Sequence, residues 1–451
     1  MARADAREAL SVGEADATHS WQGGRVAPPT STPIHRAFWP TMILPHGMRA
    51  FRYPAFRRFY AGQTVSIIGS WVQSIALSWL VYRLTGAATL LGLTAFLTQA
   101  PILLLGPVAG TLLDRFDRRR LLLIAQWSLT AQAALLGTLV LLGLAEVAWL
   151  LALAAAQGVI ASLETSARQS FLNVLVPDRE DLPNAIALNS FLMNSGRLIG
   201  PGIAGLLLSH TSEGVCFLVN AASFLAAIAA IASTPGNGSQ RASAGHRRDG
   251  ILAGIAHARS HPIPRTLLPV VLGVSFFASP YVAIMPALVR GNFGGDAGTL
   301  GMLVGAAGLG GLVGTATLAN WRRLPRLPRL TLFSCALAGA SLIGLALSPG
   351  PWVAAVFMPG VGFGIIASAA SVNVLLQATT EERMRGRMIS LYLAGFLGVS
   401  PFGALAAGVL ADAIGPVATL AAGGTVCLVL ALALARRIGT LSRRVAEALH
   451  A

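Results

Sequence analysis

Long apolar segments separated by short polar turns recur along most of the chain. A helix that crosses the hydrocarbon core of a bilayer needs about 20 apolar residues, and twelve segments reach that length. They cover approximately residues 60–82, 89–113, 121–144, 147–172, 184–208, 214–232, 267–289, 298–320, 330–348, 352–376, 388–411 and 415–435. With 54% hydrophobic and only 11% charged residues, the chain is predicted to be an all-α membrane protein with twelve transmembrane helices.

The basic residues are distributed unevenly around these segments. The chain has no Lys, so all 33 basic residues are Arg. All but four lie in the termini or in alternate loops; Arg83 and Arg290 lie at the other helix ends, and Arg168 and Arg197 lie within segments. Because Arg-rich loops stay in the cytoplasm, we expect a multi-pass protein of the inner membrane with both termini cytoplasmic. No single basic face remains for nucleic acid, despite the net charge of +15.

Composition divides the chain into two halves. A Gly, Ser and Arg-rich stretch after the sixth segment predicts a cytoplasmic linker, within which 251–261 has the pattern of a short surface helix. The aromatic and Arg residues of 51–60 are expected at the lipid headgroups. The expected divisions are a cytoplasmic tail at 1–54, disordered at first and then juxtamembrane, a six-helix bundle at 55–232, the linker at 233–265, a second six-helix bundle at 266–437 and a cytoplasmic tail at 438–451.

The two halves are weakly similar to each other. Residues 157–206 align with residues 360–409, so that Gly200 corresponds to Gly403 and Gly205 to Gly408. Parallel repeats of six helices, with a ligand site at their interface near the middle of the membrane, are a known transporter architecture. The repeat therefore predicts two pseudo-symmetric bundles.

The segment GTLLDRFDRRR, residues 110–120, lies between the second and third apolar segments. It resembles the G-x-L-x-D-R-x-G-R-R pattern found between helices 2 and 3 of the major facilitator superfamily, and it departs from that pattern at Asp117, where the family has Gly. The matching residues are Gly110, Leu112, Asp114, Arg115, Arg118 and Arg119. The resemblance implies the major facilitator fold and a secondary transporter that works by alternating access.

The fourth segment narrows the resemblance. Its E-x-x-A-R-Q run, Glu164 to Gln169, is followed by VPDREDLPNA. This combination is similar to the branch of the superfamily that contains enterobactin exporters and macrolide efflux proteins, although members carry Pro where Ser166 stands. The similarity extends over about residues 55–435. It implies export of a small amphipathic compound, drug-like or siderophore-like, with protons as the energy source; import of a small metabolite on the same fold is the alternative.

Glu164 is the only carboxylate well inside an apolar segment, and Arg168 lies one helical turn away, so the two can pair. One interpretation is a cytoplasmic latch that joins helices 2, 4 and 11 in the outward-facing state. The other is that Glu164 carries a proton. The latch would comprise Gly110, Asp114, Arg115, Arg118, Arg119, Glu164 and Arg168.

The fifth segment contains NSGRLIGPGIAG. Gly200, Pro201 and Gly205 resemble the helix-5 pattern of the superfamily's antiporters, with Ala204 in place of one Gly, and this favours export. Small residues permit close helix packing, and Pro201 removes one backbone hydrogen bond. Arg197 lies near the bilayer centre, where it must face a cavity or a partner. It either binds an anionic or catecholate substrate or packs with Asn194.

Further polar residues at helical spacing indicate a cavity wall, although such residues also join neighbouring helices. The candidates are Gln73, Gln99, Asn194, Arg197, Tyr281, Asn373 and Gln377, with Ser66, Ser70, Ser74, Gln157 and Tyr392 in the same stripes. Aromatic residues such as Trp71 and Phe396 would suit a bulky amphipathic ligand or ordinary packing against lipid.

Motifs of other classes are missing from the sequence. It contains no H-E-x-x-H, no G-x-S-x-G and no nucleotide-binding loop with Lys, so an intramembrane enzyme or a nucleotide-driven pump is disfavoured. The three Cys lie in separate segments and are expected as free thiols. We therefore predict no enzyme activity, no catalytic residues, no cofactor and no metal. From the resemblance to transporters we expect a monomer whose partners are the lipid bilayer, a small-molecule substrate and protons.

Overall fold

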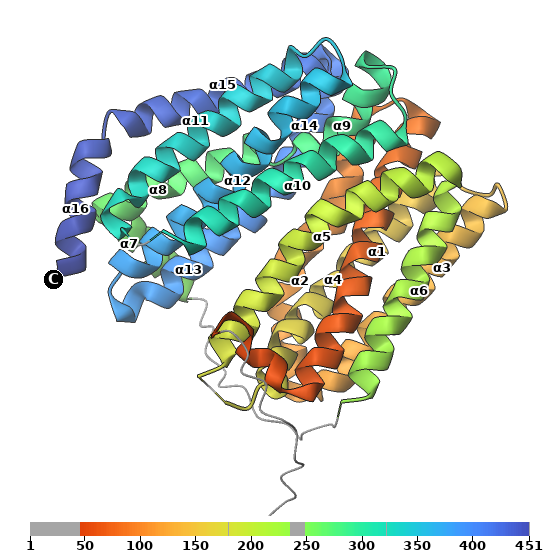
Figure 1. Ribbon diagram of the computed structural model, residues 1–451, viewed down its shortest axis with the longest axis horizontal. Coiled ribbons are helices and arrows are strands. Elements are labelled where there is room, and N and C mark those ends of the chain that lie inside the picture. The colour runs from red at the N-terminus through yellow and green to blue at the C-terminus, as the bar shows by residue number, and fades with distance from the viewer. Residues whose placement is uncertain (1–45, 179, 235–248, 322, 451) are drawn as a thin grey trace, which may run out of the picture. The chain divides into compact units, whose positions relative to one another are not determined.

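The computed structural model describes residues 46–178, 180–234, 249–321 and 323–450, and these residues are almost entirely helical (Figure 1). Twelve helical spans in this part of the chain are long and apolar enough to cross a membrane. This confirms the predicted all-α architecture of twelve transmembrane helices. Residues 1–45 of the predicted N-terminal tail and residues 235–248 of the predicted linker lie outside the described residues.

Each half of the chain contributes six of these spans. The first half contains α1 (Pro54–Thr85), α2 (Ala88–Arg115), α3 (Arg118–Leu141), α4 (Val147–Leu175), α5 (Leu182–His210) and α6 (Glu213–Ala232), preceded by the short helix η1 (His46–Arg52). The second half contains α7 (Asp249–Ser260), α8 (Pro262–Gly273), η2 (Val274–Ala278), α9 (Tyr281–Ala287), η3 (Leu288–Asn292), α10 (Ala297–Ala319), η4 (Leu324–Arg326), α11 (Leu327–Ala346), α12 (Pro351–Thr379), α13 (Glu382–Leu397), α14 (Ser400–Ile414), α15 (Pro416–Ala435) and α16 (Ile438–His450).

Helix ends follow local sequence signals. Pro occupies the first turn of α1, α8, α12 and α15, where its missing N–H has no intrahelical partner. Helix α1 ends at Thr85 and is followed by Gly86, whose φ of 66° is left-handed and therefore suits Gly. These signals place the short turns that separate the spans.

Two spans of the second half are interrupted. The seventh runs from α8 through the π-helical turn η2 and Pro280 into α9. The eleventh is divided into α13 and α14 by residues 398–399, directly before Pro401. A Pro removes one backbone hydrogen bond of a helix, and π-helical turns are frequent at functional sites. Both interruptions border the cavity described below.

The two bundles meet through glycines at positions related by the internal repeat. A Cβ on Gly205 of α5 would lie 3.1 Å from the Cα of Gly301 on α10, and a Cβ on Gly408 of α14 would lie 3.0 Å from the Cα of Gly92 on α2. Only residues without a side chain allow helices to approach so closely. The corresponding Gly205 and Gly408 therefore perform the same packing role in the two pseudo-symmetric halves.

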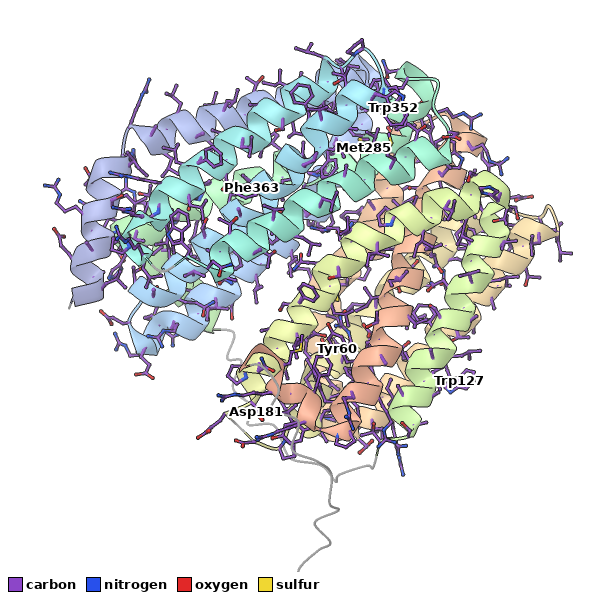
Figure 2. The ribbon with its side chains drawn as sticks, viewed as in Figure 1. Tyr60, Trp127, Asp181, Met285, Trp352 and Phe363 are labelled. Carbon is purple, nitrogen blue, oxygen red and sulfur yellow. The ribbon has the colours of Figure 1, made fainter. Side chains whose placement is uncertain are left out.

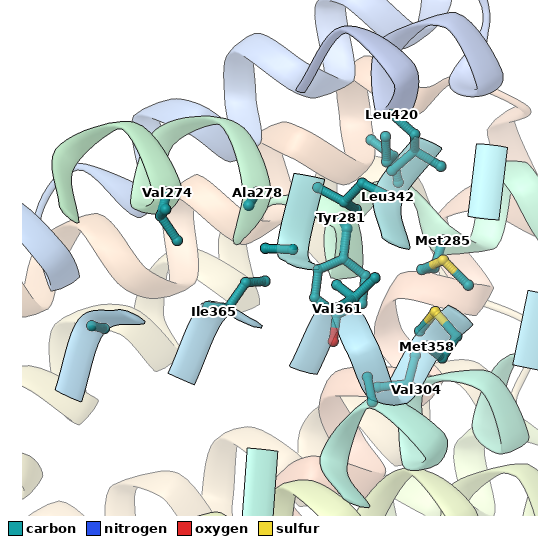
Figure 3. Close-up of a cluster of buried hydrophobic side chains, with 14 of the residues drawn as sticks. Val274, Ala278, Tyr281, Met285, Val304, Leu342, Met358, Val361, Ile365 and Leu420 are labelled. Atoms are coloured by element: carbon teal, nitrogen blue, oxygen red, sulfur yellow. The ribbon is translucent and has the colours of Figure 1, made fainter. Parts of the chain in front are cut away.

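The interior of the second bundle is a dense apolar core. Figure 3 shows Met285, Val304, Met358 and Val361 from neighbouring helices around the ring of Tyr281, and all of these side chains are buried. In contrast, Trp127 on α3 and Trp352 at the start of α12 are exposed (Figure 2). Large exposed apolar residues on long apolar helices suit a surface that contacts lipid.

The structure differs from the prediction at the start of the first span. Helix α1 begins at Pro54, six residues earlier than predicted. Phe56 and Phe59 are buried inside the first bundle, so their predicted position at the lipid headgroups is wrong. The predicted surface helix is present as α7. The C-terminal tail contains a further helix, α16, because Leu441 and Val445, one turn apart, are buried.

Candidate substrate-binding cavity

A cavity of about 510 Å³ lies between the two bundles, a size typical of small-molecule sites. Residues of both halves line it. The polar and charged lining comes mainly from the first half: Gln63, Ser66, Ser70, Ser74, Ser78, Thr94, Thr98, Gln99, Gln126, Gln157, Glu164, Thr165, Arg168 and Arg197. The second half contributes Ser279, Pro280, Val282, Ala283, Ile365, Phe396, Leu397, Ser400 and Ala404. The wall from the first half therefore carries most of the polar groups, beside apolar residues such as Ile67 and Leu129, and the wall from the second half is mostly apolar. This mixture suits an amphipathic ligand.

The apolar wall comes largely from the interrupted spans. Ser279 and Pro280 lie between η2 and α9, and Leu397 and Ser400 border the interruption between α13 and α14. Phe396 adds an aromatic ring that stacks on Tyr392, with ring centroids 6.1 Å apart. The breaks in the helices thus shape the second half of the cavity.

Glu164 and Arg168 form an ion pair on the polar wall. The distance from Arg168 Nε to Glu164 Oε1 is 2.9 Å, and the side chains are only 8% and 12% exposed for Arg168 and Glu164. Gln126 Nε2 also approaches Glu164 Oε1 at 3.4 Å, and Arg168 Nη1 approaches Met193 Sδ at 3.7 Å. The pairing expected from the one-turn spacing of Glu164 and Arg168 is therefore present.

Arg197 occupies the same wall without a counter-ion. It lies fifteen residues after the start of the 29-residue α5, and its guanidinium carbon is 5.4 Å from the centre of the Trp71 ring. Among the described residues it forms no ion pair. A cation over an aromatic face is stabilised electrostatically, but its N–H donors are left for another acceptor. Arg197 and Trp71 together can hold an anion that carries an aromatic group.

The glycines of α5 hold this part of the wall in place. A Cβ at Gly196 or Gly200 would collide with Ile67 or Trp71 of α1, whereas Gly205 faces α10 of the other bundle. Pro201 lies between them, and its carbonyl oxygen is against Gly301. The helix-5 pattern therefore positions both the Trp71 ring and the contact between bundles.

The structure brings only part of the predicted cavity set together. Gln99 and Arg197 are in the lining, with Ser66, Ser70, Ser74 and Gln157 of the same stripes. Gln73, Asn194, Tyr281, Asn373 and Gln377 are not in the described lining.

Each of these five side chains lies elsewhere for a physical reason. Gln73 Nε2 donates to Gln157 Oε1 at 3.0 Å, and Gln73 Oε1 accepts from Asn220 Nδ2 at 2.7 Å, within the first bundle. Tyr281 is in the apolar core of the second bundle (Figure 3). The amides of Asn194, Asn373 and Gln377 bond within their own helices: Asn194 Nδ2 donates to Ser190 O, and Gln377 Nε2 donates to Asn373 Oδ1.

Sequence reasoning missed Gln63 and Gln126 in the lining. Gln63 precedes Ser66, Ser70 and Ser74 at helical spacing, so extending that stripe by one turn would have found it. Gln126 is on α3, where no polar stripe marks the face that reaches the cavity. Only the packing of α3 beside α4 places it there.

The predicted latch residues between Gly110 and Arg119 lie at one end of the bundles, called here the arginine-rich end, where α2 joins α3 and α4 joins α5. Glu164 and Arg168 lie deeper, on the cavity wall. The guanidinium of Arg119 donates to the carbonyl oxygens of Ile231 at 3.1 Å and Ala232 at 2.5 Å, which close α6 of its own bundle. Arg115 is exposed, Arg118 is half-buried, and a Cβ on Gly110 would meet no atom within 4 Å. The side chain of Asp114 lies outside the described part of the chain.

Close contacts between the bundles occur at the other end, called here the distal end. There the carboxylate of Asp412 on α14 accepts hydrogen bonds from the N–H groups of Ala88, at 2.7 Å, and Thr89, at 2.8 Å. The Gly205–Gly301 and Gly408–Gly92 approaches are near the same end. The described structure is therefore joined across the bundles at its distal end.

Comparison with known families matches residues 46–448 to the model of the transmembrane secretion effectors. The chain belongs to this family of the major facilitator superfamily. Staphyloferrin A transporter from Staphylococcus aureus is 25% identical over 82% of this chain and 93% of that protein. Enterobactin exporter EntS from Shigella flexneri is 26% identical over 85% of this chain and 91% of that protein.

The fold of this transmembrane secretion effector is also found in solved structures. A bacterial homologue of the human lysosomal transporter Spinster, in an inward-facing and unoccupied conformation, matches with a TM-score of 0.65 at 15% identity, over 88% of this chain and 98% of that one. The family and fold confirm the predicted superfamily. The chain is a multi-pass membrane transporter of small substrates and not an enzyme.

Proposed function

We propose that this transmembrane secretion effector exports a small amphipathic anion, drug-like or siderophore-like, from the cytoplasm across the inner membrane. The observation that carries the proposal is Arg197, a cation held in the cavity over the Trp71 ring without a counter-ion among the described residues. The expected compound has three parts. Its anionic group would bind Arg197, its aromatic group would stack on Trp71, and its apolar body would contact the apolar wall from the second half. The names of the staphyloferrin A and enterobactin relatives support the siderophore-like class.

In the proposed orientation the arginine-rich end faces the cytoplasm, because Arg-rich loops are retained there. The structure then corresponds to the state closed to the outside, with the cavity loaded from within. Transport requires the contacts of Asp412 and of the paired glycines to separate while the arginine-rich end closes. The predicted latch of Gly110, Asp114, Arg115, Arg118, Arg119, Glu164 and Arg168 would hold that closed end.

Protons are the proposed energy source, and Glu164 is the proposed carrier. Its carboxylate faces the cavity and is held by Arg168. Rocking of the bundles would separate this pair and open the cavity that holds the carboxylate to each side of the membrane in turn. A proton could then cross with the rocking of the bundles. The protein acts as a monomer in this scheme.

The test compares cells with and without the gene, loaded with anionic carboxyfluorescein or cationic ethidium. We expect efflux of carboxyfluorescein, its abolition by Arg197→Gln and by a protonophore, and no effect of Arg290→Gln, which removes an exposed Arg at the distal end. Equal efflux by Arg197→Gln would refute the anion site. Loss of folded Arg197→Gln protein, measured by gel filtration, would instead assign the residue a packing role.

Direction is tested separately with inside-out and right-side-out membrane vesicles. Export predicts that energised inside-out vesicles accumulate the anion. Accumulation only by right-side-out vesicles would replace export by import on the same fold.

A further inference from the structure

Two buried amides beside the cavity lack hydrogen-bond partners. Nε2 of Gln63 on α1 and Oε1 of Gln126 on α3 have none within the described part of the chain, and the residues are only 2% and 1% exposed. Both residues line the cavity. Leaving a buried polar atom unpaired costs about 1–3 kcal/mol, so native structures rarely keep such atoms without a use.

The two amides lie at the same depth. Gln63 comes nine residues after the start of α1 and Gln126 eight after the start of α3, and both helices start at the arginine-rich end. At 1.5 Å per residue, both are about 12–14 Å from that end, whereas Arg197 is about 22 Å along α5. The amides therefore form a layer separate from the anion site.

The neighbouring charges determine what this layer can accept. Gln126 directs its Nε2 toward Glu164, which leaves its Oε1 as a free acceptor, while the Nε2 of Gln63 is a free donor. Glu164 would repel an anion and Arg168 would repel a cation. A neutral group with one donor and one acceptor, such as an amide, satisfies both Gln side chains without opposing either charge.

We propose that Gln63 and Gln126 form a specificity subsite for an uncharged amide-like group of the transported compound. This rests on the proposed function, because it assumes that the ligand enters this cavity. The ligand would carry its anionic group at Arg197 and its amide about one to two helical turns nearer the arginine-rich end. Both Gln atoms are occluded in the described state, so contact with the ligand requires rotation about the side-chain torsions of Gln63 and Gln126.

The test uses two probes that differ only in the amide, 4-(4-acetamidobutyl)benzoate and 4-heptylbenzoate, titrated by calorimetry into the purified full-length protein. Each carries its carboxylate on an aromatic ring, so that these groups can lie at Arg197 and Trp71 while the other end of the probe reaches the two Gln residues. We expect Gln63→Leu and Gln126→Leu each to weaken binding of the amide probe about tenfold, which is 1.4 kcal/mol, and to change binding of 4-heptylbenzoate less than twofold. The control Gln377→Leu, on an exposed amide outside the described lining, should change neither.

Thermal unfolding separates this role from a structural one. Leu has a similar size and no polar atoms, so Gln63→Leu should be as stable as the wild type or more stable. Gln126→Leu also loses the contact of Nε2 with Glu164, so only its binding is compared. Lower stability of Gln63→Leu, or equal changes in binding of both probes, overturns the subsite. Arg197→Gln tests the anion site independently of the subsite. If this variant weakens binding of both probes but the Gln variants do not distinguish the probes, the proposed function stands and the subsite is overturned. If neither probe binds the wild-type protein, both the anion site and the subsite are overturned.

Discussion

Asp412 of the second bundle caps a helix of the first. Its two carboxylate oxygens accept the N–H groups of Ala88 and Thr89, which open α2. Helix α2 has no cap of its own, because its N-cap residue is Ala87. Helix α10, in the second half, is capped by its own Asp296. The cap of α2 therefore exists only while the bundles are joined at the distal end.

Removing the cap should loosen that end. Asp412→Ala is expected to cost about 1 kcal/mol, which would shift the balance between states about fivefold toward opening of the distal end. Distances between spin labels at residues 84 and 414, measured by pulsed EPR, should lengthen. Adding Ala87→Ser gives α2 a cap within its own bundle, so it should restore thermal stability but not the short distance. An unchanged distance in Asp412→Ala would show that the cap does not hold the bundles.

Gly301 should be intolerant of a side chain. Its Cβ would collide with the carbonyl oxygen of Pro201 across the interface, and overpacking costs about 1–3 kcal/mol. Gly301→Ala should therefore lower the thermal unfolding temperature. Gly202→Ala on α5 is the matched control, since a Cβ there meets nothing within 4 Å. Equal stability of both variants would contradict the close approach of α5 and α10.

Gly110 should behave in the opposite way. Because a Cβ at Gly110 has open space in this state, Gly110→Ala, Gly110→Val and Gly110→Phe should leave thermal stability nearly unchanged. If the arginine-rich end closes over this residue, efflux should fall as the side chain grows. Full efflux by Gly110→Phe would exclude Gly110 from the proposed latch.

The Glu164–Arg168 pair should be strongly coupled. Removing one partner of a buried pair costs about 3–5 kcal/mol, whereas replacing both by apolar residues can be neutral. Glu164→Met and Arg168→Met should each destabilise the protein, and the double variant should recover much of that loss. Thermal unfolding of the four proteins gives the coupling energy. Additive effects of the two substitutions would contradict a structural ion pair.

The α10 cap should make stability depend on pH. Hydrogen bonds from the backbone and side chain of Thr299 lower the pKa of Asp296 in the folded protein. The stabilisation is therefore complete above the unfolded-state pKa of Asp, about 3.9, and is lost as pH falls through the lower folded-state pKa. Asp296→Asn should keep the cap but lose this dependence, as followed by unfolding between about pH 2 and 5. An unchanged acid profile would contradict the cap.

The sequence by itself determined the features that depend on local spacing. Twelve apolar runs of sufficient length had to become spans, because a bilayer leaves no other partner for their backbone groups. Glu164 and Arg168, four residues apart on one helix, could be paired before any fold was known. Leu441 and Val445, four residues apart on α16, carry the same kind of local signal.

Only the tertiary structure decided which polar faces meet the cavity. Gln73 and Gln63 belong to the same helix, yet the packing of α6 against α1 draws Gln73 to Asn220 and leaves Gln63 beside the cavity. Asp412 reaches Ala88 across 324 residues of chain. A helical pattern states which residues share a face, but the neighbour of that face depends on how the helices pack, and this is a property of the whole chain.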